Sequence, residues 1–299
     1  MNDAAAQSRI APQTSDFAGR VVVVTGAAGG IGTAIARRLA ADGARLALLD
    51  QRAEPLEDIA RALRDDGADA VALPVALSRT ADVEAAVASI ENELGPIAHL
   101  AHAAGILRIG AALTQADADW DACMDANARG QFVVTRAVAQ RMAARANGSI
   151  VVVGSNAAAV PRAGMAAYGA SKAAARYQLQ CLGLELAPLG IRCNLVSPGS
   201  TDTPMQQAFA PTEADRQRIL RATRAVSGSA SRWGGSPARR ISPTPWPSCC
   251  RIVRATSRST TCAWMAVRPL MPEEVVPAAL PRCRDISCCE GIVFANNSH

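Results

Sequence analysis

This sequence has almost no lysine: Lys172 is the only one, and the other 30 of its 31 basic residues are arginine. Arginine is a planar, permanently charged fork, whereas lysine is a compact ammonium on a flexible stem. A single lysine kept in a chain that otherwise uses arginine therefore indicates chemistry that arginine cannot perform. Lys172 stands four residues after Tyr168, which is one of only two tyrosines.

Long apolar segments are also missing. No apolar run reaches the roughly 18 residues that a membrane-spanning helix needs. Residues 1–17 are polar and rich in alanine, without the basic start and apolar core of a signal peptide. We therefore expect a cytoplasmic protein without a membrane partner, in which residues 1–17 form a disordered N-terminal extension.

Metal and nucleic-acid sites have no support in the composition. The nine cysteines fit no zinc spacing, and without a secretion signal they are not expected to form a disulfide framework. Residues 1–226 carry 22 basic and 22 acidic side chains, whereas residues 227–299 carry nine arginines and four acids. The net charge of +5 thus comes from the tail, which has no nucleic-acid motif or interleaved aromatics.

The body of the chain alternates between strand and helix patterns, which predicts one α/β domain over residues 18–226 with a Rossmann-like, doubly wound parallel sheet. The expected strands are Val21–Thr25, Arg45–Asp50, Ala70–Val75, Ile97–Ala103, Ser149–Gly154 and Arg192–Ser197. The expected helices are Thr33–Asp42, Pro55–Asp66, Ala81–Leu94, Ala118–Ala144 and Met165–Pro188.

A glycine-rich loop joins the first strand to the first helix. Gly26, Gly30 and Gly32 have the spacing of a dinucleotide-binding turn, where the backbone approaches a pyrophosphate at a helix N-terminus. Asp50 ends the second strand, where it can accept both ribose hydroxyls and would repel a 2′-phosphate, which favours NAD. Arg52 nearby leaves NADP as the alternative.

Tyr168 and Lys172 lie one helical turn apart and therefore share a helix face. A neighbouring ammonium favours the phenolate, so the spacing predicts a lowered pKa for Tyr168 and a role as a base.

Together these features resemble the short-chain dehydrogenase/reductase family over about residues 18–226. The matching features are Thr25-Gly26-xxx-Gly30-x-Gly32, Ala103-Ala104-Gly105, Asn127, Ser155, Tyr168-xxx-Lys172 and Pro198-Gly199. The resemblance implies that Tyr168 is the acid/base and that Lys172 lowers its pKa and binds the nicotinamide ribose. It implies that Ser155 bonds the reacting oxygen and that Asn127 holds a water-linked proton relay.

The same resemblance implies a set of NAD contacts, including Thr203 on the carboxamide: Thr25, Gly26, Gly30, Ile31, Gly32, Asp50, Ala104, Gly105, Tyr168, Lys172, Pro198, Gly199, Thr201 and Thr203. Two positions depart from the family pattern. His102 stands where the family usually has asparagine, and we interpret it as a structural substitute. Ala76 stands where an aspartate commonly contacts adenine, so one cofactor hydrogen bond is expected to be missing.

Three segments resemble, more narrowly, the family's dehydrogenases of 2,3-dihydro-2,3-dihydroxybenzoate, which serve catecholate siderophore synthesis. They are residues 104–110, 160–165 and 192–203. This resemblance implies a small, carboxylated dihydrodiol substrate. Because arginine binds a carboxylate through a bidentate fork, Arg162 is the first candidate for this contact and Arg108 the second, with Met165 also at the substrate site.

The chain changes character at about residue 227. The family's last helix, last strand and Val-Asp-Gly-Gly segment are absent there, whereas a shifted reading frame restores a sequence of that kind. In that frame each codon combines the last base of one residue's codon with the first two bases of the next. At five residue pairs the genetic code then allows only one amino acid, and all five agree with the family's ending: Trp233-Gly234, Trp246-Pro247, Cys249-Cys250, Trp264-Met265 and Met265-Ala266. We therefore interpret residues 227–299 as an aberrant, frameshifted tail, with a genuine divergent tail as the alternative.

Three functional interpretations stay open: this dihydrodiol dehydrogenase, another short-chain enzyme such as a 3-oxoacyl thioester reductase, and an inactive remnant that the tail has disabled. The helices around Asn127 and Tyr168 resemble the family's subunit interface, so we expect a homo-oligomer, either a tetramer or a dimer.

Overall fold

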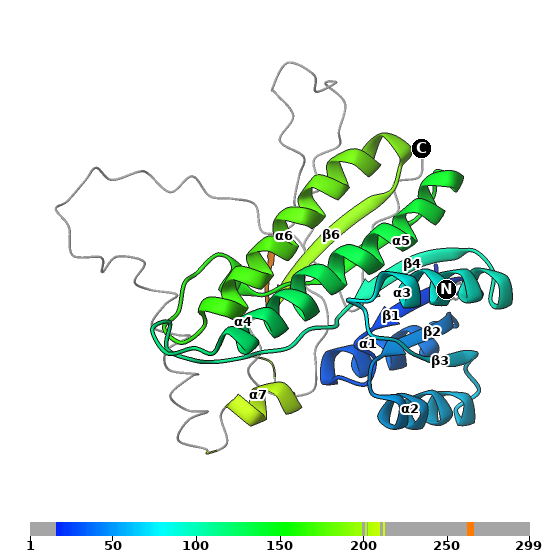
Figure 1. Ribbon diagram of the computed structural model, residues 1–299. Helices are drawn as coiled ribbons and strands as arrows, with labels where there is room; N and C mark the ends of the chain where they lie inside the picture. The colour runs from blue at the N-terminus through cyan, green and yellow to red at the C-terminus, as the bar shows by residue number, and fades with distance from the viewer. Residues whose placement is uncertain (1–15, 199–200, 202, 210–211, 213–261, 266–299) are drawn as a thin grey trace, which may run out of the picture.

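Six parallel strands with helices on both faces confirm the predicted Rossmann-like sheet in the computed structural model (Figure 1). The structure describes residues 16–198, 201, 203–209, 212 and 262–265. The parallel strands are β1 (Val21–Thr25), β2 (Arg45–Asp50), β3 (Ala70–Pro74), β4 (Ile97–His102), β5 (Ser149–Val153) and β6 (Arg192–Pro198). The α-helices are α1 (Gly30–Ala41), α2 (Ala53–Asp65), α3 (Thr80–Glu93), α4 (Asp117–Cys123), α5 (Gly130–Arg145), α6 (Ala166–Leu186) and α7 (Pro204–Phe209).

The strands lie in the order β3-β2-β1-β4-β5-β6-β7. A short seventh strand, β7 (Cys262–Met265), pairs antiparallel with β6. Four residues of the predicted aberrant tail therefore extend the edge of the sheet. Strand pairing at a sheet edge uses backbone groups, so it does not require the alternating side-chain pattern that the tail lacks.

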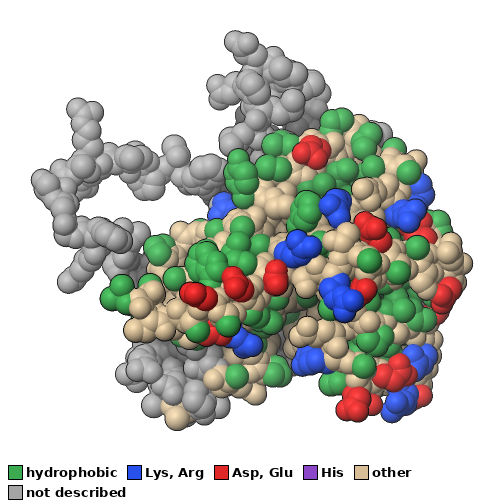
Figure 2. Space-filling model, in the orientation of Figure 1, with side chains coloured by type: hydrophobic (Ala, Val, Ile, Leu, Met, Phe, Trp, Pro, Cys, Tyr) green, Lys and Arg blue, Asp and Glu red, His purple; other side chains and the backbone are tan. Residues whose placement is uncertain are grey.

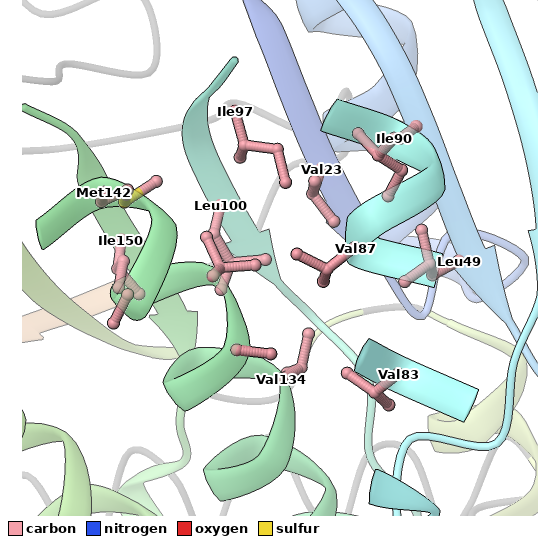
Figure 3. Close-up of a cluster of buried hydrophobic side chains, with 14 of the residues drawn as sticks. Val23, Leu49, Val83, Val87, Ile90, Ile97, Leu100, Val134, Met142 and Ile150 are labelled. Atoms are coloured by element: carbon pink, nitrogen blue, oxygen red, sulfur yellow. The ribbon is translucent and has the colours of Figure 1, made fainter. Parts of the chain in front are cut away.

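Side chains alternate across the sheet and build two cores. On β1, Val21 and Val23 face the layer of α3, α5 and α6, whereas Val22 and Val24 face the layer of α1 and α2. This two-residue period is the geometry of a strand that is covered on both faces. Figure 3 shows the first core, where Val23 and Leu100 of the sheet meet Val87 of α3.

The sheet reverses its direction of growth between β1 and β4, which are neighbours although three strand positions apart in the chain. At such a switch point the connections leave on opposite faces and open a crevice at the carboxyl ends of the strands. Thr25 and His102 end these two strands and stand opposite one another in register. The fold therefore places the glycine loop and the Ala103-Ala104-Gly105 segment at one crevice.

The predicted long helix Ala118–Ala144 is divided in the structure. A π-helical turn, η1 (Met124–Arg129), joins α4 to α5 and contains Asn127. Short 3-10 turns also follow two elements: η2 (Asn156–Ala158) after β5 and η3 (Ala187–Leu189) after α6. Figure 1 shows α5 and α6 running side by side in front of β6.

Among the described residues, no helix combines the length and apolarity needed to cross a membrane. Residues 1–15 of the predicted N-terminal extension and most of the predicted tail lie outside the described residues, so the two domain boundaries stay predictions. Phe17, the last residue of the predicted extension, is buried in the core beside α1 and α2, so the expectation of disorder is wrong at this residue.

Candidate active site

The loop after β1 is shaped by the lack of side chains. Gly26 has a φ of +65°, and a Cβ built on it would lie 2.6 Å from the Ala104 Cα. A Cβ built on Gly32 would lie 2.1 Å from the Gly26 carbonyl oxygen. Neither position can therefore hold a larger residue, and the backbone between them turns directly into the N-terminus of α1 at Gly30. This is a cradle that fits a pyrophosphate.

Asp50 lies at the end of β2 beside this cradle and is buried. Its carboxylate accepts hydrogen bonds from the Ala28 amide at 3.2 Å and from the Arg52 amide at 3.1 Å. The Arg52 guanidinium also contacts it, with Nε 3.2 Å from Oδ1. Asp50 is thus held toward the glycine loop and is paired with Arg52, while its predicted contact with the ribose stays a prediction.

His102 replaces the expected asparagine with a fully buried ring. Its Nδ1 lies 2.8 Å from the Thr25 hydroxyl, and the Ala104 amide donates to the same hydroxyl at 3.4 Å. Burial and the nearby Lys172 lower the pKa of His102 to about 3, so the ring is neutral at physiological pH. Its Nε2 has no hydrogen-bond partner among the described residues. These contacts agree with a structural role and tie β1 to β4.

Tyr168, on the first turn of α6, meets Ser155 at the end of β5. Burial raises the pKa of Tyr168 above its ordinary value of 10, and a hydrogen bond with the Ser155 side chain acts in the opposite direction. The Cys123 thiol raises this pKa further, whereas Arg162 lowers it. The expected lowering by Lys172 is therefore not the outcome here: the net shift is upward, because loss of hydration outweighs the favourable contacts.

Lys172 lies on the same helix with its ammonium buried. Its Nζ donates to the Val153 carbonyl at 3.1 Å, and a Cβ built on Gly105 would lie 3.1 Å from that Nζ. Burial lowers the pKa of Lys172 to about 8. The compact head of a lysine fits this narrow space between β5 and the segment after β4, which accounts for a lysine in a chain of arginines.

Asn127 is buried in η1, and its side chain is engaged on three sides. Its Oδ1 accepts from the Ile106 amide at 2.8 Å, and its Nδ2 donates to the Ile106 carbonyl at 2.9 Å and to the Ser171 hydroxyl at 2.9 Å. Both amide hydrogens are therefore used to hold the segment after β4 against α6. A proton relay through Asn127 would have to use its remaining oxygen lone pair or its backbone carbonyl.

The two arginine candidates differ in their surroundings. Arg108 is half-exposed and forms an ion pair with Asp119, with 3.3 Å between Nε and Oδ1. Arg162 is exposed, has no ion pair among the described residues, and is close enough to lower the pKa of Tyr168. Met165, three residues after Arg162, forms an isolated parallel β-bridge with Gly110. Arg162 is thus the cation that is available beside the phenol.

The remaining predicted cofactor contacts lie in α1 and between β6 and α7, and only part of the second segment is among the described residues. Pro198 ends β6, and Thr203 caps α7 by accepting from the Gln206 amide at 3.2 Å. A Cβ built on Gly30 would lie 2.9 Å from the Thr203 Cγ2, so α7 reaches the glycine loop. The Thr201 carbonyl accepts from the Thr203 hydroxyl at 3.4 Å, and Ile31 lies in the first turn of α1. Gly199 lies outside the described residues.

Sequence reasoning missed two groups of side chains at this site. Ser171 bonds Asn127, and Gln131 bonds α6 one turn farther along. A signal for Gln131 was present in the sequence: Asn127, Gln131 and Thr135 recur every four residues, which places them in one polar strip on a helix face that is otherwise apolar and buried.

Known proteins resemble this chain in both sequence and structure. Residues 20–214 match the family described as short chain dehydrogenase. The chain is 45% identical over 203 residues to 2,3-dihydro-2,3-dihydroxybenzoate dehydrogenase of Bacillus subtilis (strain 168), which covers 68% of this chain and 78% of that protein. It is 39% identical over 205 residues to the enzyme of the same description from Escherichia coli (strain K12), covering 68% and 79%.

Two solved structures share the fold. An NAD+-bound xylitol dehydrogenase superposes with a TM-score of 0.66 at 30% identity, covering 69% of this chain and 85% of that one. A variant actinorhodin polyketide ketoreductase with NADPH superposes with a TM-score of 0.63 at 32% identity, covering 70% and 81%. The family match ends at residue 214, before the tail begins.

Proposed function

Because this chain belongs to the short-chain dehydrogenase family and is an oxidoreductase that uses a nicotinamide cofactor, we propose that it oxidises 2,3-dihydro-2,3-dihydroxybenzoate to 2,3-dihydroxybenzoate. This reaction would serve catecholate siderophore synthesis in the cytoplasm. The observation that carries the proposal is the position of Arg162, a cation without an ion pair among the described residues, beside the Ser155–Tyr168 pair.

NAD is the proposed cofactor. The glycine cradle fits the pyrophosphate, and the buried Asp50 carboxylate fits the two ribose hydroxyls as an acceptor. A 2′-phosphate there would face this carboxylate, although Arg52 offsets part of its charge. When bound, NAD supplies the acceptor for the hydride that leaves the substrate carbon.

Tyr168 and Ser155 would carry out the transfer of the substrate's hydroxyl proton. The substrate hydroxyl would bond both side chains, and Tyr168 would take its proton while the carbon loses hydride. Since burial keeps the Tyr168 pKa high, the phenolate forms only when positive charge is close to it. Among the described residues Arg162 lowers this pKa, and Lys172 lies one turn along the same helix. The ketone so formed tautomerises: the neighbouring ring carbon loses its proton, the carbonyl oxygen gains one, and the aromaticity of the resulting catechol favours the products.

Arg162 would bind the substrate carboxylate. A charge-assisted pair of this kind contributes about 1.5–3 kcal/mol, which corresponds to roughly 10- to 100-fold in affinity. Arg108 is less suited, because Asp119 already occupies its guanidinium.

A second copy of the chain is the proposed partner. Phe132 of α5 and Tyr177 and Leu184 of α6 are exposed by 42%, 70% and 51%. Figure 2 shows hydrophobic side chains gathered over these two helices. Such an exposed apolar face fits the interface of a homodimer or homotetramer. We expect sedimentation velocity of the full chain to show one of these, and a monomer would contradict the proposal.

An enzyme assay tests the proposed reaction. The full chain would be incubated with NAD or NADP and with 2,3-dihydro-2,3-dihydroxybenzoate or the same diol without its carboxylate. We expect NAD and the carboxylated diol to react best. Arg162→Ala should raise the KM for the carboxylated diol about 10- to 100-fold with little change for the neutral diol. Arg108→Ala, the matched control, should raise it less than about threefold.

Other outcomes separate the alternatives. A preference for NADPH and a ketone would favour another short-chain reductase. An unchanged KM in Arg162→Ala would remove the carboxylate contact. A protein that binds neither cofactor would be the inactive remnant.

A further inference from the structure

Helices α5 and α6 are joined by a strip of buried polar side chains that no role in the proposed reaction explains. Gln131 of α5 donates from Nε2 to the Ala175 carbonyl at 2.6 Å and to the Gln178 Oε1 at 3.0 Å. Gln178 of α6 donates in return to the Thr135 hydroxyl at 3.3 Å, and that hydroxyl donates to the Gln131 carbonyl at 2.8 Å. The three side chains close a ring of hydrogen bonds between the two helices.

The α5 side of this ring is buried, whereas Gln178 of α6 is partly exposed. Gln131 is 1% exposed and Thr135 is not exposed at all. Burying an amide is unfavourable unless its hydrogen bonds are made, and here both Nε2 bonds of Gln131 are made. Apolar contacts, however, do not fix how one helix is rotated or shifted along another. A satisfied polar network does fix this, because its bonds have direction.

The ring lies one helical turn after two predicted catalytic residues, Asn127 in η1 before α5 and Lys172 on α6. Asn127 precedes Gln131 by four residues, and Lys172 precedes Ala175 by three. The bond from Asn127 to Ser171 is the next contact in the same direction. The position of α6 relative to α5 therefore determines where Tyr168 and Lys172 stand relative to Asn127.

We propose that Gln131 is a positioning residue that holds α6 in the rotation and height at which Tyr168 meets Ser155 and Lys172 reaches the segment after β4. This proposal rests on the proposed function only for its kinetic consequence. Its structural consequence concerns the phenol of Tyr168 and can be measured without a substrate.

The chain offers a direct probe of that phenol. It has two tyrosines, and Tyr177 is exposed, so Tyr177→Phe leaves Tyr168 as the sole phenol. Burial, Ser155, Cys123 and Arg162 set the pKa of Tyr168, and burial is the largest of these causes. If α6 loosens, water reaches the phenol, and its pKa falls toward the ordinary value of 10.

The experiment compares Gln131→Met with Gln140→Met in the Tyr177→Phe protein. Methionine resembles glutamine in length and shape but cannot donate the two bonds, and Gln140 is an exposed glutamine of the same helix. Absorbance at 295 nm follows the titration of Tyr168 over the pH range in which circular dichroism shows folded protein. We expect a downward shift in Gln131→Met, a smaller one in Gln178→Ala, and none in Gln140→Met.

Steady-state kinetics complete the test. We expect Gln131→Met to lower kcat about five- to tenfold, the equivalent of one lost hydrogen bond, with the KM for NAD unchanged within about twofold. If the parent has no activity but the titration shifts, the positioning role stands and the proposed function fails. An unshifted Tyr168 titration in folded Gln131→Met overturns the positioning role, whatever the kinetics show.

Discussion

The cofactor side of the site is shaped by side chains that are missing, whereas the proton-transfer side is shaped by buried polar side chains that are present. At the first, Gly26 and Gly32 allow backbone to lie where any Cβ would collide. At the second, Asn127 and Gln131 bind other elements through directed hydrogen bonds. The cradle therefore tolerates no added atom, and the helix pair tolerates changes of shape better than the loss of a donor.

The strongest test of this difference adds one methyl group to the cradle. Gly32→Ala would place a Cβ 2.1 Å from the Gly26 carbonyl oxygen, a contact that only a backbone movement can relieve. We expect NADH affinity to fall at least about 100-fold, because the loop can no longer approach the pyrophosphate. Fluorescence titration with NADH measures this loss.

A matched glycine separates contact from backbone strain. Gly67 has a φ of +86°, and a Cβ added there would meet open space, so Gly67→Ala introduces only the strain of a left-handed backbone. It should lower stability by about 1–2 kcal/mol and leave NADH binding unchanged. If Gly32→Ala bound NADH as tightly as Gly67→Ala does, the steric account of the cradle would be wrong.

On the proton-transfer side of the site, Lys172 predicts how the free energy of unfolding depends on pH. Its pKa is lowered to about 8 in the folded protein, from 10.5. Between these values the unfolded chain holds a proton that the folded chain has lost, so stability rises with pH across this window. Below pH 8 the folded protein carries the full unfavourable energy of a buried ammonium, which is on the order of 3 kcal/mol.

Lys172→Met should remove this dependence. We expect urea unfolding to show that the parent gains about 3 kcal/mol relative to Lys172→Met between pH 8 and 10.5. Other titrating groups are common to both proteins and cancel in the difference. Parallel stability curves for the two proteins would show that the ammonium is not held in a dry site.

The layers of the fold could be predicted from the sequence, because they depend on local patterns, whereas the roles of the motif residues stay predictions. Arg45–Asp50 was predicted with the bounds that β2 has, since a buried strand between turn residues is a strong signal. The turn η1 and the contacts of Gln131 could not be predicted, because they depend on how α5 and α6 meet in space. The direction of the Tyr168 pKa was missed for a related reason. Spacing reveals a neighbouring charge but not the depth of burial.

His102 ties β1 to β4 between the two sides of the site, and its expected effect is confined to acid pH. Its pKa is lowered to about 3 from 6.5, so as pH falls below 6.5 the unfolded chain takes up a proton that the folded chain refuses. Stability contributed by this neutral ring is therefore lost progressively on acidification, by about 1.4 kcal/mol per pH unit. His102→Asn should keep a hydrogen bond to Thr25 and reduce that slope by one proton between pH 6 and 4.5, measured by urea unfolding. His99, whose pKa is lowered to about 4 by burial, remains in both proteins and contributes to the slope that is left. An unchanged slope in His102→Asn would mean that His102 is hydrated and takes up a proton in the folded protein.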